Sequence, residues 1–245
     1  MKKWSVEPLL LTSARLSTFR EDFILTGASG FFFLRDERLF LATSRHVLFD
    51  EASGHVPDRI EIELHVDESD LAKSTGFSMP LYHDDKPVWR QGGDASGAID
   101  VAVIEIEREA LPEPSIYKAF TPDHLPGSLE KIEAGESVLV VGFPLGFHDT
   151  FHHMPVVRQG VIASSYGLRF QGQGFFLTDA RTHRGASGAP VVTRAVRKRA
   201  ATLDPPWILL GVHSTRFDVL RDLERDEALG LNCAWYADIL MTLTE

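Results

Sequence analysis

Short apolar runs separated by turns are the sequence feature that most constrains the fold. Residues 31–34 and 39–42 are apolar and flank the charged turn 35–38, which predicts a β-hairpin. Residues 60–66 alternate apolar and polar side chains, which predicts a half-buried strand. Further strands are expected at residues 99–104, 137–141, 156–162, 174–177, 189–193, 207–212 and 231–236. Because strands and helices do not alternate, the pattern predicts an all-β protein with hairpin connections.

Prolines indicate how these strands are grouped. Pro112, Pro114, Pro122 and Pro126 punctuate residues 107–130, the best candidate for a linker between two halves. We therefore expect an N-terminal unit, residues 1–115, and a C-terminal unit, residues 116–245, with barrels of similar size. Residues 67–98 are polar and irregular and are expected to form loops. A short helix is expected at residues 238–243, with Asp238 as its N-cap.

Composition excludes several classes of protein. The 245 residues carry 25 Lys and Arg against 35 Asp and Glu, a net charge of −10 that argues against nucleic acid as a partner. The one basic run, Arg194 with residues 197–199, is interpreted as a solvated turn. No apolar run approaches the ~18 residues that a membrane span needs. Cys233 is the single cysteine, so no intramolecular disulfide forms. With a signal peptide poorly supported, a cytoplasmic, bacterial protein is expected.

A glycine-rich turn presents one serine between two of the expected strands. Residues 185–190 read GASGAP, and glycines at 185 and 188 permit a very tight turn. Such a turn can aim the N–H groups of Gly185 and Ser187 at one point, as an oxyanion hole requires. The hydroxyl of Ser187 then needs only a base to become a nucleophile. The same four letters, GASG, occur at residues 27–30, where they are interpreted as an ordinary strand entry.

A histidine and an aspartate complete the pattern that catalysis by this serine requires. His46 follows an apolar strand, and Asp100 lies at the entrance of residues 99–104, where a lone carboxylate needs a partner. An imidazole can take the serine proton because its ordinary pKa is near neutrality, and a buried carboxylate can fix its tautomer. Asp94 is the rival carboxylate, in a glycine-rich stretch interpreted as exposed. Asp179 is expected to make structural hydrogen bonds.

Three sequence blocks resemble chymotrypsin-fold, trypsin-like serine peptidases over roughly residues 25–240, closest in style to the bacterial stand-alone and HtrA-type branch. The blocks are residues 43–47, residues 99–103, and residues 178–180 with 185–190. The resemblance implies two six-stranded antiparallel β-barrels and a short C-terminal helix. It also implies a serine endopeptidase acting on proteins or peptides, with His46 as general base, Asp100 as its orienting carboxylate, Ser187 as nucleophile, and an oxyanion hole made by the amides of Gly185 and Ser187.

The sequence differs from parts of the family at two points, and the resemblance also implies a substrate preference. Ala186 stands where many animal members carry an aspartate, so activation by N-terminal clipping is not expected, and no PDZ domain follows before Glu245. His213 and Thr182 are similar to the pair that holds a glutamate side chain in bacterial glutamyl endopeptidases, which implies cleavage after acidic residues. Against this stand an apolar or small-residue preference and a purely structural His213. The residues expected to bind substrate are His213, Thr182, Arg181, Ser214 and Thr215.

The sequence also permits other interpretations of its function. The chain could be a catalytically latent or inactive module that binds peptides or a regulatory partner, docked for instance on residues 221–227. His148, His152 and His153 cluster in sequence, but no ligand framework accompanies them, so neither a metal nor a cofactor is expected. Cys233 lies in an apolar stretch and is expected in the core.

Overall fold

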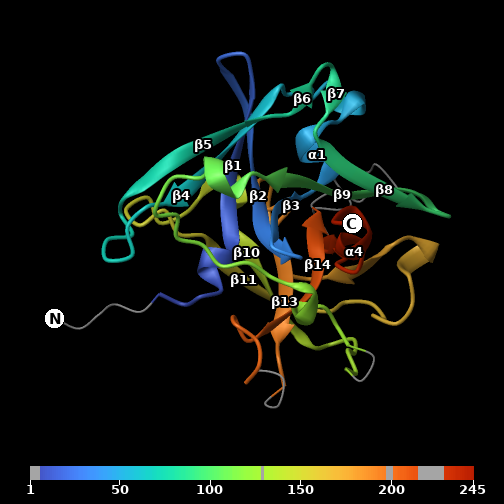
Figure 1. The fold of residues 1–245 in the computed structure, drawn as a ribbon. Helices are drawn as coiled ribbons and strands as arrows, with labels where there is room; N and C mark the ends of the chain where they lie inside the picture. Colours follow the sequence, from blue (N-terminus) through green and yellow to red (C-terminus); the bar gives the residue numbers. More distant parts are fainter. Residues whose placement is uncertain (1–5, 128–129, 197–200, 215–228) are drawn as a thin grey trace.

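The computed structural model describes residues 6–127, 130–196, 201–214 and 229–245 (Figure 1). It is built almost entirely of antiparallel strands, and its α-helices among these residues are α1 (Arg45–Leu48) and α4 (Ile239–Leu243). The short 3-10 helices are η1 (Leu10–Thr12), η2 (Glu51–Ser53), η3 (Arg108–Ala110), η4 (Pro122–His124), η5 (Pro144–Gly146) and η6 (Phe170–Gly172). The all-β class and the short C-terminal helix are therefore confirmed, although Asp238 makes no side-chain cap.

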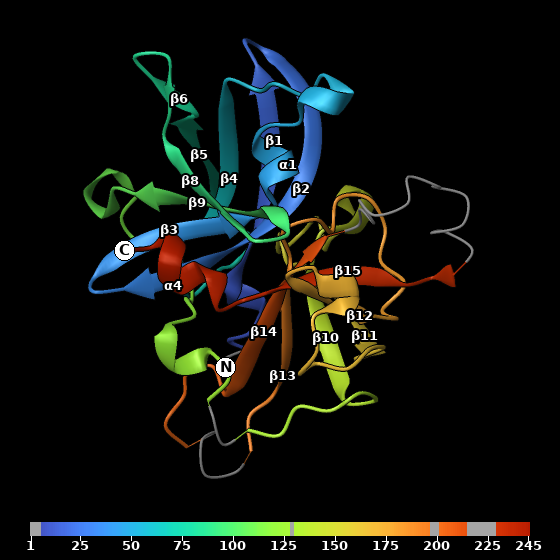
Figure 2. The ribbon, with the colours of Figure 1, turned by 90° about the vertical axis from the view of Figure 1, so that its right-hand side faces the viewer.

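Two large sheets divide the strands between the halves of the chain (Figure 2). The first has the order β5-β4-β1-β2-β3-β9-β8 and the second β11-β10-β13-β14-β15-β12. The first sheet contains β1 (Ser13–Arg20), β2 (Phe23–Arg35), β3 (Arg38–Thr43), β4 (Arg59–His65), β5 (Ser74–Pro80), β8 (Trp89–Asp94) and β9 (Gly97–Ile106). The second contains β10 (Ser137–Gly142), β11 (Val156–Val161), β12 (Phe175–Thr178), β13 (Pro190–Arg194), β14 (Trp207–Ser214) and β15 (Asn232–Tyr236). The first sheet thus has seven strands where six were expected.

The expectation of loops over residues 67–98 is wrong. Strand β5 pairs with β4 from His65↔Ser74 to Arg59↔Pro80, and β8 pairs with β9. A small hairpin of β6 (Tyr82–His83) and β7 (Lys86–Pro87) lies between them. Both β5 and β8 are edge strands of the sheet, and much of their surface is exposed. Because exposed edge strands carry many polar side chains, these two strands lack the apolar periodicity from which a strand is predicted.

The two sheets share a hydrophobic core. Phe33 and Val103 of the first sheet belong to the same buried cluster as Val141, Leu209 and Val212 of the second. The proline-rich connection joins this core, because Phe120 is fully buried and exchanges backbone hydrogen bonds with Phe32 and Leu34. Helix α4 packs back on β8 and β9. The halves are therefore joined by apolar packing, and a site between them is held from both sides.

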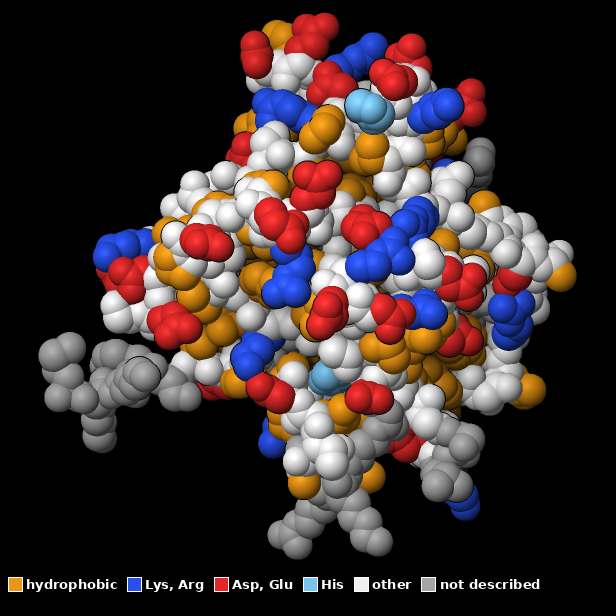
Figure 3. Space-filling model, viewed as in Figure 1, with side chains coloured by type: hydrophobic (Ala, Val, Ile, Leu, Met, Phe, Trp, Pro, Cys, Tyr) orange, Lys and Arg blue, Asp and Glu red, His pale blue; other side chains and the backbone are white. Residues whose placement is uncertain are grey.

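The surface carries mixed charges. Figure 3 shows acidic and basic side chains interspersed on one face of the molecule. Among the described residues, no helix has the length and apolar character to cross a lipid bilayer.

Candidate active site

His46 and Asp100 meet because their strands are neighbours. Strand β3 pairs with β9 at Thr43↔Ala102, so the residues that follow β3 reach the first turn of α1 beside the beginning of β9. The His46 backbone N–H donates to Asp100 Oδ1 over 2.9 Å, and Nδ1 lies 2.7 Å from Oδ2. One contact fixes the His46 backbone and the other fixes its imidazole against the carboxylate. The imidazole Nε2 is then available to accept a proton.

The Asp100 carboxylate is buried yet held in its charged form. Burial on its own would raise the pKa of Asp100, but the charge and hydrogen bonds of His46 and the hydroxyl of Ser214 lower it below its ordinary value. Ser214 Oγ donates to Asp100 Oδ2 over 3.0 Å. An ionised carboxylate in this position stabilises a protonated imidazole.

The serine turn is packed against the segment that leads to His46. Gly188 has φ +85°, and its N–H donates to the His213 carbonyl over 2.8 Å. Ser44 Oγ donates to the same carbonyl over 3.2 Å. A Cβ on Gly188 would lie 2.2 Å from the Ser29 carbonyl oxygen and 3.0 Å from the Ser44 nitrogen. The structure therefore brings Ser187, which is 5% exposed, next to the segment that carries His46.

Ser29 also supports the site, although it was not predicted from the sequence. Its N–H donates to the Ser187 carbonyl over 3.0 Å, and its hydroxyl donates to the Gly185 carbonyl over 2.8 Å. The same hydroxyl accepts from the Phe143 N–H over 2.9 Å. The first GASG copy is thus not an ordinary strand entry, because it binds the second copy. The repetition of the four letters was the signal available in the sequence.

The peptide between Arg184 and Gly185 has a defined orientation. The Leu145 N–H donates to the Arg184 carbonyl over 2.5 Å. In a trans peptide the N–H points opposite to the carbonyl, so the Gly185 N–H points away from Leu145. Within the described part of the chain, this N–H donates to no acceptor. An unused amide beside Ser187 is suited to receive an external oxygen atom.

The residues expected to bind substrate fall into separate groups. Thr182 Oγ1 lies 2.5 Å from His213 Nε2 and donates to Asn232 Oδ1 over 2.7 Å, so Asn232 joins a pair that the sequence predicted. Ser214 is engaged with Asp100, as described above. Arg181 is exposed, and Thr215 lies outside the described residues, as do residues 197–199 and 221–227.

The buried position of His213 controls its charge. Burial, and then the nearby charge of His46, lower the pKa of His213 to about 3. The ring is therefore neutral at neutral pH. Because Thr182 donates its hydroxyl hydrogen to Asn232, Nε2 of His213 carries the hydrogen that reaches Thr182. His213 can orient Thr182, but it does not offer a positive charge.

The other polar candidates make structural contacts. Asp94 pairs with Arg169 over 2.6 Å, on a strand rather than in the loop expected from the sequence. Asp179 accepts from the Val161 N–H over 2.6 Å, and its structural role is confirmed. Cys233 is 1% exposed and lies in the core, as expected.

Comparison with known proteins defines the class of this chain. Residues 28–197 match the family described as the trypsin-like peptidase domain. The match covers most of the chain, so the chain belongs to this family. No curated protein sequence matches it.

Two solved structures share the fold at 17% sequence identity. The serine endoprotease from Yersinia pestis aligns with a TM-score of 0.54 over 96% of this chain and 62% of its own. The scabies mite inactivated protease paralogue S-I1 aligns with a TM-score of 0.58 over 97% of this chain and 95% of its own. The chain thus spans less than two thirds of the first structure. These likenesses support the chymotrypsin-like fold.

Proposed function

We propose that the protein is a serine endopeptidase in which Ser187 attacks the peptide carbonyl. His46 accepts the proton of the Ser187 hydroxyl and later gives it to the leaving amine, and Asp100 orients the imidazole and stabilises its protonated form. The observation that carries the proposal is the double contact between His46 and the buried Asp100, beside the turn that holds Ser187.

The amides of Gly185 and Ser187 are proposed to form the oxyanion hole. In the tetrahedral intermediate the carbonyl oxygen of the substrate becomes negatively charged, and two N–H donors stabilise that charge. The Gly185 N–H supports this role because no described residue occupies it. The contact of His46 with Asp100 favours an active enzyme over a latent or inactive module. The similar fold of an inactivated mite paralogue means that fold alone does not decide activity.

Cleavage after acidic residues is the finer part of the proposal. The short contact between Thr182 and His213 supports a polar group at the base of the specificity pocket. Because His213 is neutral, it orients Thr182 through a hydrogen bond and supplies no charge. The exposed Arg181 is proposed as the cation that attracts a substrate carboxylate. The substrates are proposed to be proteins or peptides.

Hydrolysis of an unfolded protein substrate tests the proposed activity. Wild-type protein should yield fragments that mass spectrometry can map, and Ser187→Ala should lower the rate by ~10³-fold or more. Ser165→Ala, at an exposed serine of the same half, serves as the control and should cleave like wild type. Equal cleavage by Ser187→Ala would contradict the proposal, and so would the absence of cleavage by folded wild-type protein.

A further inference from the structure

Three side chains with metal-binding atoms meet outside the set of proposed catalytic residues. Glu63 lies on β4 of the first sheet, and His148 and His153 lie in the connection between η5 and β11 of the second half. Their ligand atoms all lie within 4.8 Å of one another. These histidines cluster in sequence with His152, and no ligand framework for them was expected from the sequence. The fold supplies a carboxylate from a distant strand, while His152 turns to Asp149.

Glu63 is held as an oriented carboxylate. Arg15 donates to its Oε2 from Nε over 2.9 Å and from Nη2 over 2.6 Å, and Ser74 Oγ donates to Oε1 over 2.8 Å. Burial would raise the pKa of Glu63, but these hydrogen bonds and the charge of Arg15 lower it below its ordinary value. Oε1 keeps a second lone pair, so a charged oxygen ligand faces the histidines. Contacts of this kind orient metal ligands from outside the first coordination sphere.

His153 is placed unusually for a loop histidine. Its backbone has φ +56°, a left-handed conformation that costs ~1 kcal/mol or more in a residue with a side chain. Its Nδ1 lies 2.7 Å from Glu63 Oε1 but is not aligned for a hydrogen bond, so this buried atom has no hydrogen-bond partner among the described residues. A buried polar atom without a partner is costly unless another group satisfies it. A cation that binds both atoms from one side would satisfy both.

His148 contributes a ring nitrogen with a fixed tautomer. Its Nδ1 lies 2.6 Å from the Gly146 carbonyl, so Nδ1 carries the hydrogen and Nε2 keeps its lone pair. This is the usual arrangement of a metal-binding histidine, whose second nitrogen donates to a backbone carbonyl.

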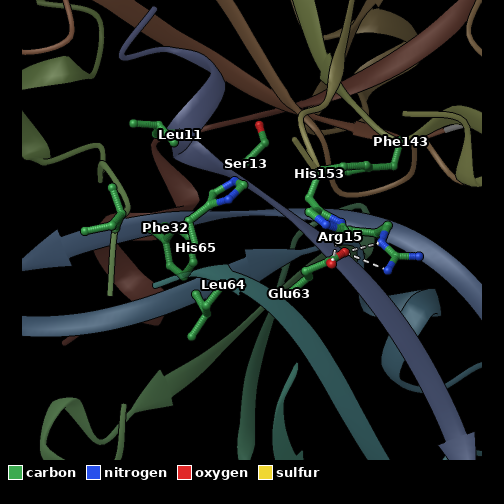
Figure 4. Close-up of a pocket in the computed structure, with 10 residues that line it drawn as sticks. Leu11, Ser13, Arg15, Phe32, Glu63, Leu64, His65, Phe143 and His153 are labelled. Carbon is green, nitrogen blue, oxygen red and sulfur yellow. Dashed lines mark hydrogen bonds and ion pairs between the residues drawn. The ribbon is translucent and has the colours of Figure 1, made fainter. Parts of the chain in front are cut away.

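A small cavity lies beside Glu63 and His153, although His148 does not line it. Figure 4 shows Glu63, Arg15 and His153 close together, with His65 and Phe143 among the other lining residues. The cavity has a volume of about 10 Å³, which is about the space that one water molecule needs.

We propose that Glu63, His148 and His153 bind one divalent transition-metal ion of the Zn²⁺ class, with water in the fourth position. Two imidazoles and one carboxylate are a ligand set that Zn²⁺ prefers, whereas Ca²⁺ and Mg²⁺ prefer oxygen ligands. Because Arg15 already neutralises Glu63, we expect micromolar affinity.

The ion would connect the two halves near the serine turn. It would fix strand β4 to the connection that begins at η5, where Leu145 holds the Arg184 carbonyl. Metal binding should therefore stabilise the folded protein by mass action. The site is proposed as a structural clamp, and its existence does not depend on the proposed peptidase activity.

Calorimetric titration of chelator-treated protein with Zn²⁺ tests the site. Wild type should bind one ion and unfold at a higher temperature with it. His148→Ala and His153→Asn should each weaken binding at least ~10–100-fold; asparagine tolerates the left-handed backbone at position 153. His152→Ala, next to the site but paired with Asp149, is the matched control and should bind like wild type.

Several outcomes would overturn the proposal. They are the absence of one-to-one binding to wild type, unchanged affinity in both ligand variants, or an equal loss in His152→Ala. Co²⁺ titration of wild type gives a readout that needs no variant. A site with four ligands should show visible absorption bands that Zn²⁺ abolishes, and their absence at saturating Co²⁺ would also refute it.

Discussion

The Ser29 hydroxyl donates a hydrogen bond of 2.8 Å to the Gly185 carbonyl, across 156 residues of sequence. Both residues belong to copies of the same tetrapeptide, one in each half of the chain. Because Ser29 also accepts from the Phe143 N–H, one hydroxyl connects the serine turn to the connection after β10. Ser29 is therefore a positioning residue for Gly185, whose N–H on the preceding peptide is the proposed oxyanion donor.

Replacing Ser29 by alanine should reduce peptidase activity without touching the nucleophile. The change leaves the Phe143 N–H and the Gly185 carbonyl without their partner, which should cost ~1–3 kcal/mol of unfolding free energy. We expect kcat to fall about tenfold, less than the ~10²–10³ for direct loss of an oxyanion donor. Ser17→Ala on the neighbouring strand is the control. Wild-type kcat in a Ser29→Ala protein with an intact fold would show that the hydroxyl does not position the turn.

A methyl group at position 188 should prevent the serine turn from forming. Gly188 has φ +85°, and its added Cβ would lie 2.2 Å from both the Ser29 carbonyl oxygen and Thr43 Oγ1. Gly188→Ala should therefore destabilise the protein by ~3 kcal/mol or more in urea unfolding, through strain and overpacking together.

A second glycine separates backbone strain from packing. Gly54 has φ +71°, and no atom lies within 4 Å of its added Cβ. Gly54→Ala should cost only ~1–2 kcal/mol, the price of the left-handed backbone. Equal losses in the two variants would mean that the close approach of Gly188 to β2 and β3 does not constrain the turn.

Stability should decrease as the pH falls below about 6.5. Burial lowers the pKa of His213 to about 3 and also lowers that of His65, while both take up protons near pH 6.5 once unfolded. Below pH 6.5 the unfolded chain binds more protons than the folded protein. The contribution of the two neutral histidines to the free energy of unfolding is therefore complete above pH 6.5 and is lost below it. Asp100 and Glu63 have lowered pKa values, so their contributions are lost only below their unfolded values of 3.8 and 4.5.

Urea unfolding between pH 7.5 and 5 isolates the two histidines. His213 alone should change the unfolding free energy by at most ~1.4 kcal/mol per pH unit. His83→Ala, at a side chain that is 85% exposed, should leave the slope unchanged. A flat profile over this range would contradict the assignment of His213 and His65 as neutral buried groups.

A panel of peptides tests the proposed acidic preference. Matched substrates with Glu or Gln at the cleaved position differ only in charge, so kcat/KM should favour Glu by about tenfold if Arg181 attracts the carboxylate. Arg181→Ala should remove most of the difference, while Arg20→Ala, at an exposed residue of the first sheet, should not. A panel in which Glu and Asp react no better than Ala or Leu would end the acidic hypothesis.

The sequence predicted those parts of the fold that bury apolar side chains. The hairpin at residues 31–42 is confirmed, and both faces of its strands are buried. The strand at residues 60–66 is confirmed as β4, which alternates buried and half-buried residues. Strands β5 and β8 were missed because edge strands satisfy their backbone by pairing on one side and need few apolar residues.

The sequence singled out the residues of the proposed site but not the residues that support them. His46, Asp100 and Ser187 were singled out by residue type and order, and the contact of His46 with Asp100 is now observed. Asn232 and Glu63 could not be found in this way, since their partners lie far along the chain and only the folded strands bring them together. For Ser29 the repeated GASG was the one signal in the sequence.

Reaction of the protein with a fluorophosphonate tests the central claim most directly, because the reagent bonds to a serine oxygen only when a base and an oxyanion hole activate it. We predict one adduct per wild-type molecule, mapped to Ser187 by mass spectrometry, and none in folded Ser187→Ala or His46→Ala. No adduct on folded wild-type protein, or an undiminished adduct after removal of the Ser187 hydroxyl or the His46 imidazole, would contradict the account.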